Sequence, residues 1–426
     1  MSIIQNKEEL STNSLRKAGL DILEAGLLAV QTTKIIESKI KIKEGHIFCI
    51  NESCLDLTMY KRVFFIGIGK CAFDGASVIE SVLGDFLTQG IVIDVKGGVL
   101  KKMKSMVGTH PYPSEINIKA AEEIVKMLKD LTEQDLVLAL ISGGGSSLFC
   151  LPNDRDCENL INITKDLTFK GADILELNTV RKHLSQVQGG GLAKLCFPAS
   201  VISLIFSDVL GNDLEFIASG PTVMDQTSIS DAQKVLEKFG LAQKYESLEF
   251  TETPKDEKYF KHVYNTLLCT NMDALMAMKE KAVSLGFDTL IMDDSLSGEA
   301  KEVGKKLAQK EHTANSCLLF GGESTVKVGA NSGVGGRNQE VALAALPLVC
   351  ENSLIIAASS DGYDNTPSAG AIADREILEK SKSLELDPED FLARNDSFNF
   401  FRSVGGAIST GRLGSNVSDL FIILNK

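Results

Sequence analysis

Three charged residues occupy positions where a ligand could reach them. Lys70 and Asp208 each follow a long apolar run, and Arg337 follows two glycines at the start of a predicted helix. Lysine and arginine can neutralise anionic oxygens, and an aspartate can accept a proton or bind a metal ion. The alternatives are a solvated surface lysine and a turn aspartate. The placement after apolar runs favours a site for a phosphoryl or carboxylate group.

A glycine-rich loop interrupts the apolar stretch Leu138–Phe149, LALISGGGSSLF. A tight strand-to-helix turn would need one glycine, whereas this loop has three glycines among three serines. Backbone N–H groups bared by glycine before a predicted helix suit an anion, and serine hydroxyls add donors. The loop therefore predicts a substrate or phosphate cradle formed by Ser142, Gly143, Gly144, Gly145, Ser146 and Ser147.

Further polar residues follow predicted strands or lie on one predicted helix. The segment Asn178–Leu195 reads as a helix carrying Arg181 and His183, which are candidates for substrate or phosphate contact, although a solvated face is the alternative. His110, in GTHPYPSE, has either a loop-geometric or a substrate-contact role. In the second half, the glycine turns predict nucleotide-binding residues: Gly322, Glu323, Asn338, Asp361, Asp364, Arg412 and Asn416.

The elements that must position these residues alternate along the chain. Apolar runs without polar alternation are separated by segments of helical period, which predicts buried, mostly parallel strands flanked by helices. We expect an α/β fold with two domains and an interdomain cleft. The predicted domains are a Rossmann-like domain over residues 1–250, a charged linker over 251–261, and a second α/β domain over 262–426.

The composition excludes several classes of protein. The 426 residues carry a net charge of −13, which argues against binding to nucleic acid or to a membrane surface. No apolar run is long enough for a membrane span, and the polar start predicts a cytoplasmic protein. Nine cysteines without a CxxC pair, and five scattered histidines, argue against a zinc site and a disulfide framework, so the cysteines are expected to be reduced.

Taken together, the loops resemble the class II glycerate 2-kinases, whose C-terminal half is called the MOFRL domain. The motifs include GIGKCAFDGA, LISGGGSSL, LNTVRKHLSQVQGGGLA, SDVLGNDLEFIASGPT, GGRNQE and DGYDNTPSAGA. The resemblance implies phosphorylation of D-glycerate at its 2-hydroxyl by ATP and Mg²⁺. It also implies that Lys70, Asp208 and Arg337 are catalytic. Asp208 is either the base or a metal ligand, and a homodimer remains a hypothesis.

Three positions depart from the family pattern. Gln188 stands where members usually have lysine, Asn365 where they have glycine, and Arg412 lies in a C-terminal loop that usually lacks arginine. These departures leave open which small hydroxy acid is the acceptor.

Two rival functions rest on other features. Gly67-Ile68-Gly69-Lys70-Cys71-Ala72 matches the G-x-G-x-x-A dinucleotide fingerprint, and Asp94 ends the next strand, which suits an NAD-dependent dehydrogenase. The same scaffold could also be a non-catalytic sensor of sugar acids. Binding of NADH against Mg-ATP separates the first rival from the kinase, and release of ADP separates the second.

Overall fold

The chain divides into two compact units in the computed structural model, which describes residues 2–311, 313–329 and 332–426. Unit 1 combines Met1–Lys34 with Cys269–Lys426, and unit 2 is Ile35–Leu268. These boundaries differ from the predicted ones. The N-terminal segment joins the C-terminal unit because its helix packs there, and the predicted linker 251–261 lies within unit 2.

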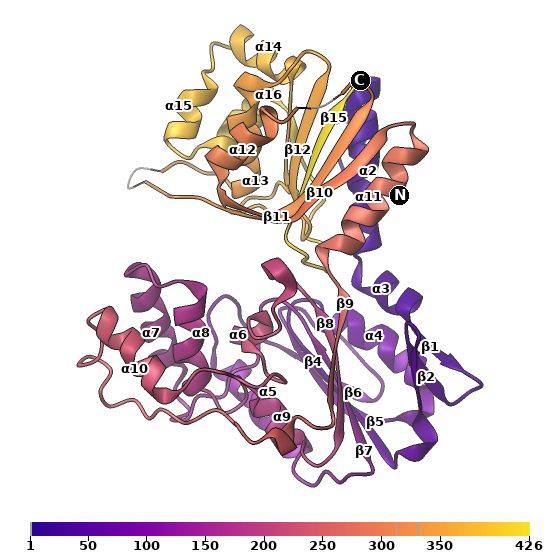
Figure 1. Ribbon diagram of the computed structural model, residues 1–426, viewed down its shortest axis with the longest axis vertical. Coiled ribbons are helices and arrows are strands. Elements are labelled where there is room, and N and C mark those ends of the chain that lie inside the picture. Colours follow the sequence, from indigo (N-terminus) through magenta and orange to yellow (C-terminus); the bar gives the residue numbers. More distant parts are fainter. Residues whose placement is uncertain (1, 312, 330–331) are drawn as a thin grey trace. The chain divides into compact units, whose positions relative to one another are not determined.

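Unit 2 contains a six-stranded sheet covered by helices (Figure 1), and its central strands are almost wholly buried. Among the described residues the order is β6-β5-β4-β7-β8-β9, and the pairings from β6 to β8 are all parallel. Parallel neighbours end at the same edge, so the loops after β4, β7 and β8 are brought together. The strands are β4 (Arg62–Ile68), β5 (Leu87–Asp94), β6 (Met103–Val107), β7 (Asp135–Ile141), β8 (Ser200–Phe206) and β9 (Val263–Cys269).

Helices cover this sheet, as the sequence predicted for its α/β pattern. Helix α5 packs against the face that presents Phe64, Ile66 and Ile68, where a single apolar core forms. The helices after the first sheet strand are α4 (Ala72–Leu83), α5 (Glu115–Met127), α6 (Gly145–Leu148), α7 (Cys157–Phe169), α8 (Ile174–His183), α9 (Gly191–Cys196) and α10 (Ile229–Lys238). Short 3₁₀ turns are η1 (Leu57–Met59), η2 (Gly84–Phe86), η3 (Leu210–Asn212), η4 (Ile217–Ser219) and η5 (Glu257–Tyr259).

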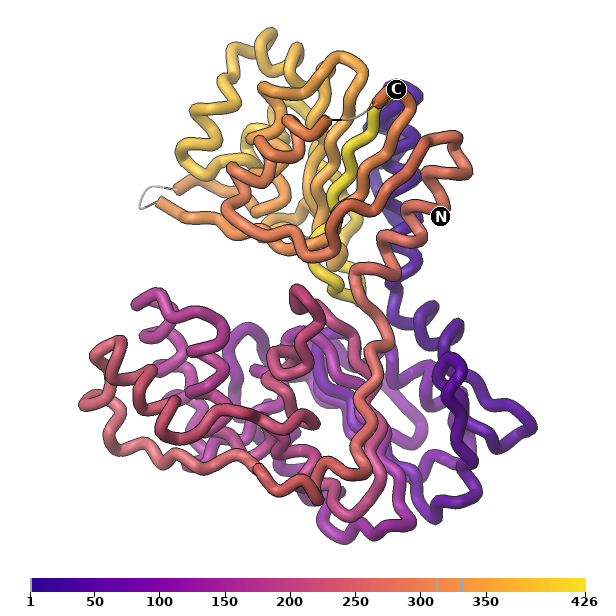
Figure 2. Tube along the Cα trace, viewed as in Figure 1, coloured from indigo at the N-terminus to yellow at the C-terminus, as the bar shows by residue number. Residues whose placement is uncertain are grey.

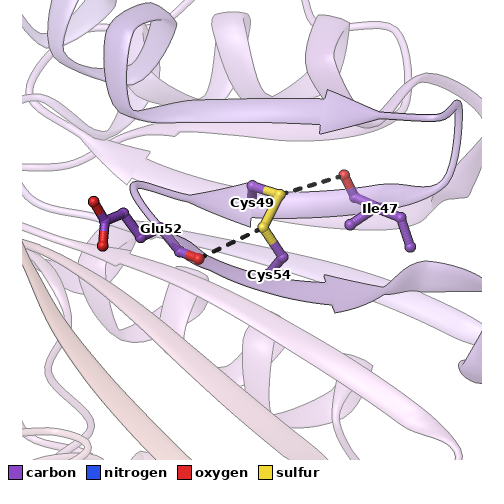
Figure 3. The surroundings of a disulfide bond; sticks show 4 residues. All are labelled: Ile47, Cys49, Glu52 and Cys54. Atoms are coloured by element: carbon purple, nitrogen blue, oxygen red, sulfur yellow. Dashed lines mark hydrogen bonds between the residues drawn. A yellow bond between two sulfur atoms is a disulfide. The ribbon is translucent and has the colours of Figure 1, made fainter.

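A small antiparallel sheet of β1 (Ile40–Lys43), β2 (Ile47–Ile50) and β3 (Ser53–Asp56) completes unit 2 and contains a disulfide (Figure 3). The hairpin register places Cys49 directly opposite Cys54, with a Cα–Cα distance of 4.1 Å. The prediction that the cysteines are all reduced is therefore wrong at this pair. The sequence spacing does not show the pairing, because it depends on the hairpin register.

Unit 1 is built on a mixed sheet with the order β10-β11-β15-β12-β13-β14 among the described residues. Of the described strands, only β10 and β11 pair in parallel, so this sheet is less parallel than expected, although the α/β class is confirmed. The last strand, β15, inserts between β11 and β12 and is antiparallel to both. The strands are β10 (Asp288–Glu299), β11 (Ser316–Thr325), β12 (Ser353–Ser359), β13 (Gly370–Asp374), β14 (Ala407–Ile408) and β15 (Asp419–Asn425).

Helices from both ends of the chain cover the unit 1 sheet. Figure 2 shows the N-terminal segment beside α11. The long helix of this segment, α2, packs closely on α11 where Gly26 meets Met278. This contact explains why residues 1–34 belong to unit 1. The helices are α1 (Lys7–Leu10), α2 (Ser14–Ala29), α3 (Thr32–Lys39), which crosses the unit boundary, α11 (Asn271–Ser284), α12 (Ala300–Ala308), α13 (Arg337–Ala345), η6 (Leu346–Leu348), α14 (Arg375–Ser383), α15 (Pro388–Ala393) and α16 (Ser397–Val404).

Each helix in the described part of the chain is too short or too polar to cross a lipid bilayer. One predicted helix is broken: α8 ends at His183, a turn follows, and α9 begins at Gly191. Leu184 is the C-cap of α8, and Gly189 and Gly190, with φ of +55° and +86°, lie in the turn that precedes α9. Ser185, beyond the end of α8, forms an isolated bridge with Pro152, so the prediction of one helix over Asn178–Leu195 is wrong.

Candidate active site

The glycine loop at the end of β7 contacts the loops that follow β4 and β8. The Lys70 N–H donates to the Gly143 carbonyl at 3.0 Å, and the Ser142 N–H donates to the Ile68 carbonyl at 2.9 Å. A side chain on Gly143 would overlap the Asp208 carboxylate. The structure thus brings Lys70 and Asp208 to one loop, as the positions after the strands predicted.

This loop requires glycine because neighbouring side chains leave little room for a Cβ atom. Gly144 has φ of +81°, and a Cβ there would lie 3.1 Å from carbons of Lys70 and His110. A Cβ on Gly145 would crowd Ala218. The helix after the loop, α6, is a single turn, so no long helix stands directly behind the predicted cradle. His110, whose role the sequence left undecided, lies at the loop.

Lys70 and Arg181 are cations that have no carboxylate partner among the ion pairs of the described residues. Lys70 is partly exposed after β4. The Arg181 Nε donates to Thr164 Oγ1 at 3.4 Å, and burial lowers the pKa of Arg181 below its usual value. Partly buried guanidinium groups are usually paired, so an unpaired one favours binding of an anion.

His183 lies in a buried polar network and not at the glycine loop. Its Nδ1 is 2.8 Å from the Thr179 carbonyl, and its Nε2 is 3.3 Å from Glu252 Oε1. The neighbouring Lys182 ammonium is 3.2 Å from Asp225, which is itself buried. This position indicates that His183 ties α8 to the segment that follows α10, and its contact with substrate stays a prediction.

Three polar residues near the loop were missed as site candidates. The Ser219 hydroxyl lies 2.9 Å from that of Ser146 and 3.1 Å from Asn178 Oδ1. Gln188 Nε2 donates to the Ser146 carbonyl at 2.8 Å. Asn178 and Gln188 lie in the motif LNTVRKHLSQVQGGGLA, but a helical pattern in the sequence does not show which amides face a distant loop.

Asp94 does not offer its carboxylate to a ligand. It is buried, and it accepts hydrogen bonds from the Phe73 N–H at 2.9 Å and the Val95 N–H at 2.6 Å. Burial raises its pKa to about 6. Both oxygens hold the start of α4 and the end of β5, which removes the ribose contact that a dehydrogenase would need.

The second group of predicted residues gathers at one edge of the unit 1 sheet. Arg337 makes a two-pronged pair with Asp419, with Nε–Oδ2 at 2.6 Å and Nη2–Oδ1 at 3.0 Å. Its Nη1 is 2.6 Å from Glu323 Oε1. Burial alone would lower the pKa of Arg337, but the Asp419, Glu323 and Asp364 carboxylates together raise it above its usual value. The guanidinium is therefore held by carboxylates on two sides.

Asp364 caps α13 from the loop after β12. The N–H groups of Asn338 and Gln339 donate to its two oxygens at 3.0 and 2.9 Å. Burial raises the pKa of Asp364 to about 6, although these donors oppose the shift. The Asn338 side chain also donates to Asp419 at 2.8 Å. Asn338 and Asp364 thus stabilise the helix start and the Arg337 pair.

The other predicted residues of unit 1 form the surrounding loops. Asp361 accepts from the Ser359 hydroxyl and the Tyr363 N–H, at 2.8 and 2.9 Å. Asn416 accepts from the Ser418 N–H at 3.0 Å. A side chain on Gly322 would overlap the Leu296 carbonyl of the neighbouring strand. The glycine therefore allows β10 and β11 to pair closely.

Comparisons with known proteins identify the family. Residues 19–249 match the model of a domain of unknown function, DUF4147, and residues 316–419 match that of the MOFRL family. A D-glycerate 2-kinase from Thermotoga maritima is 38% identical over 85% of this chain and 90% of its own length. This chain belongs to the class II glycerate 2-kinase family.

Further matches to glycerate kinases extend over nearly the whole chain. A glycerate 2-kinase from Pyrococcus horikoshii is 34% identical over 96% of this chain and 97% of its own length. A crystal structure of a glycerate kinase from Thermotoga maritima superposes with a TM-score of 0.84 at 34% identity, covering 97% of this chain and 100% of that one. The membership in the class II glycerate 2-kinases that the motifs indicated is confirmed.

The structure accounts for two departures from the glycerate kinase pattern. Asn365 has φ of +55°, and asparagine is among the non-glycine residues that best tolerate this region. The Arg412 guanidinium stacks over the Tyr363 ring at 4.0 Å. The Asn365 departure therefore keeps the backbone conformation, and the Arg412 departure adds a cation–π contact.

We expect Gly143→Ala to lower turnover, because the added methyl group must displace the Asp208 carboxylate. The overlap should also cost about 1–3 kcal/mol of folding free energy. Steady-state kinetics and urea unfolding measure the two effects. Gly171→Ala is the control: Gly171 has φ of +84° with open space around it, so the change should cost stability but leave turnover unchanged. Wild-type turnover in Gly143→Ala would show that Asp208 need not stay against this loop.

Proposed function

We propose that this protein transfers the γ-phosphoryl group of ATP to the 2-hydroxyl of D-glycerate and gives 2-phosphoglycerate. The observation that carries the proposal is that Lys70 and Asp208 lie against one glycine loop in a member of the glycerate kinase family. A cation that has no carboxylate partner among the described residues and a carboxylate at the same loop can serve the two ends of such a transfer. The cation compensates phosphoryl charge, and the carboxylate receives a hydroxyl proton.

Each residue of the loop region has a role in this proposal. Asp208 orients the 2-hydroxyl of the acceptor and accepts its proton as the oxygen attacks phosphorus. Lys70 faces the negative charge that spreads over the phosphoryl oxygens. Arg181 holds the acceptor carboxylate, because this guanidinium is partly buried and has no carboxylate partner in the ion pairs of the described residues. Ser146 and the backbone of residues 142–147 position the transferred group.

The loops at the sheet edge of unit 1 are proposed to bind the nucleotide. Arg412 is exposed and Asn416 is partly exposed, so both can reach a ligand. Asn338 and Asp364 support these loops through α13, and Arg337 supports them through Asp419. A direct contact of Arg337 with phosphate remains a prediction.

Magnesium fits the proposed chemistry in a limited way. The described residues contain no group of three or more histidines, cysteines or carboxylates that could hold a metal ion. Mg²⁺ commonly binds through one or two carboxylates, waters and the phosphates of its nucleotide, and Asp208 could be such a carboxylate. When bound, the ion would neutralise the charge of the nucleotide phosphates. A homodimer is also a prediction, which sedimentation velocity would test.

The test is a screen for ADP release with small hydroxy acids, ATP and Mg²⁺. We expect turnover with D-glycerate and none without an acceptor, and phosphorus NMR should assign the product as the 2-phosphate. Turnover with another hydroxy acid alone would keep the kinase but change the acceptor. Oxidation of NADH with hydroxypyruvate would support the dehydrogenase, and binding without ADP release would support the sensor.

A further inference from the structure

Two buried side-chain amides are connected to Ser146 of the glycine loop, Gln188 directly and Asn178 through Ser219. Asn178, on α8, is 2% exposed, and Gln188, in the turn after α8, is 1% exposed. Gln188 Nε2 donates to the Ser146 carbonyl at 2.8 Å and to the Phe149 carbonyl at 3.4 Å. Asn178 Oδ1 accepts from the Ser219 hydroxyl, which also lies against the Ser146 hydroxyl. Both amides are therefore tied to the loop through one of their two polar atoms.

The second polar atom of each amide has no partner within the described residues. These atoms are Nδ2 of Asn178, a donor, and Oε1 of Gln188, an acceptor. Buried polar atoms are nearly always satisfied, and unsatisfied ones cost free energy that a ligand can recover. An unused acceptor thus lies on the amide that is bonded to Ser146, and an unused donor lies on the amide that Ser219 joins to Ser146.

The backbone beside these amides is held in an uncommon conformation. Ala218 and Ser219 have φ of +52° and +59°, a region that non-glycine residues seldom adopt. The Gly189 N–H donates to the Ser219 carbonyl at 2.9 Å and fixes this turn beside Gln188. The turn holds the Ser219 hydroxyl between Asn178 and Ser146. Strain of this kind persists where the surrounding structure requires a particular geometry.

We propose that Asn178 and Gln188 recognise a second hydroxyl of the acceptor, the one that is not phosphorylated. A hydroxyl accepts through a lone pair and donates through its proton, so it complements an unused amide N–H and an unused amide oxygen. The ligand class is a 2-hydroxy acid that carries a further hydroxyl on C3. This inference rests on the proposed function, and it adds the feature of the acceptor that these residues read.

Both unused atoms are closed to solvent, so a ligand reaches them only after a neighbouring side chain moves. Ser146 is the partly exposed member of the group. A change in its rotamer would release the Ser219 hydroxyl and open Asn178. The acceptor hydroxyl then takes the place of the Ser146 hydroxyl, while the Gln188 bond to the Ser146 carbonyl keeps the loop backbone in position.

D-lactate is the matched probe, because it keeps the carboxylate and the 2-hydroxyl of D-glycerate and replaces the C3 hydroxymethyl by methyl. We expect the wild-type kcat/KM ratio of D-glycerate to D-lactate to be on the order of 100-fold or more. In Asn178→Ala and in Gln188→Met the ratio should fall by roughly 10-fold or more, through loss on D-glycerate with little change on D-lactate. A merely structural role would lower both acceptors alike and leave the ratio unchanged.

Thr179→Ala is the control, since Thr179 lies next to Asn178 on α8 and its hydroxyl donates only within the helix, to Leu175. It should keep the wild-type ratio. Equal use of both acceptors by the wild-type protein, or an unchanged ratio in both folded variants, overturns the proposal. If a variant does not fold, the wild-type kcat/KM ratio still tests the proposal. Asn178→Ser tests it as well, because serine keeps a donor and should retain part of the ratio.

Calorimetric titration of the two acids separates this inference from the kinase proposal, because it needs no turnover. Protein that releases no ADP but binds D-glycerate at least about 10-fold more tightly than D-lactate would contradict the kinase and support hydroxyl recognition. Protein that releases ADP but binds both acids equally would support the kinase and overturn this inference. Absence of D-glycerate binding would overturn both.

Discussion

Lys70→Ala should reduce kcat by on the order of 100-fold or more while leaving the melting temperature nearly unchanged. Lys70 follows β4, is partly exposed, and takes part in none of the ion pairs of the described residues. Its removal therefore breaks little structure. A cation directed at charge that develops in the transition state can nevertheless contribute several kcal/mol to the rate. Steady-state kinetics and thermal unfolding on the same preparation measure the two quantities.

Lys96→Ala is the matched control for this experiment. Lys96 follows the neighbouring strand, β5, and pairs with Asp74 at the surface, where ion pairs contribute little to stability. The control should leave both kcat and the melting temperature unchanged. Near-normal turnover of Lys70→Ala would assign Lys70 to the solvated surface and remove the main support for charge compensation at the glycine loop.

Replacing Arg337 should destabilise unit 1, and this expectation comes from its partners. Arg337→Ala leaves the fully buried Asp419 carboxylate without its guanidinium, and breaking a buried pair in this way costs about 3–5 kcal/mol. Arg337→Lys keeps the charge but loses the two-pronged geometry, so about 1–3 kcal/mol should be lost. Urea unfolding measures both losses.

Arg412→Lys serves as the control, because Arg412 is exposed and stacks on Tyr363 without a carboxylate partner in the ion pairs of the described residues. It should leave the unfolding midpoint almost unchanged. The sequence-based hypothesis of a phosphate clamp makes the opposite prediction for Arg337→Lys. It expects unchanged stability and a loss of roughly 10-fold or more in kcat/KM. That result would show that Asp419 is not the main partner of Arg337 in the working enzyme.

The contrast between these two cations illustrates what strand-end positions can predict. Lys70 and Asp208 were placed together from the sequence alone, because parallel neighbouring strands bring their following loops to one edge. Arg337 was placed from its position after two glycines at the start of a helix. Its engagement by Asp419 was not predicted, because Asp419 begins the last strand, which inserts between β11 and β12. An antiparallel insertion of this kind leaves no periodic signal.

The same reasoning explains the errors in the helices, the cysteines and the domain boundaries. Arg181 and His183 lie two residues apart on α8. Arg181 has no carboxylate partner in the ion pairs of the described residues, whereas His183 is buried among Thr179, Glu252 and Asp225. The hairpin register alone decides that Cys49 meets Cys54. The packing of α2 on α11 decides that the N-terminus belongs to unit 1.

The amino-acid sequence by itself determined the α/β class, the family and the glycine loop at the end of a buried strand, because apolar runs and glycine clusters are local features. Tertiary structure alone decided which side chains meet at that loop. Asn178, Gln188 and Ser219 come from three separate segments, and their contacts with Ser146 follow from strand order, from turns at positive φ and from the burial of amides. Such contacts depend on distances between remote segments, which sequence spacing does not encode.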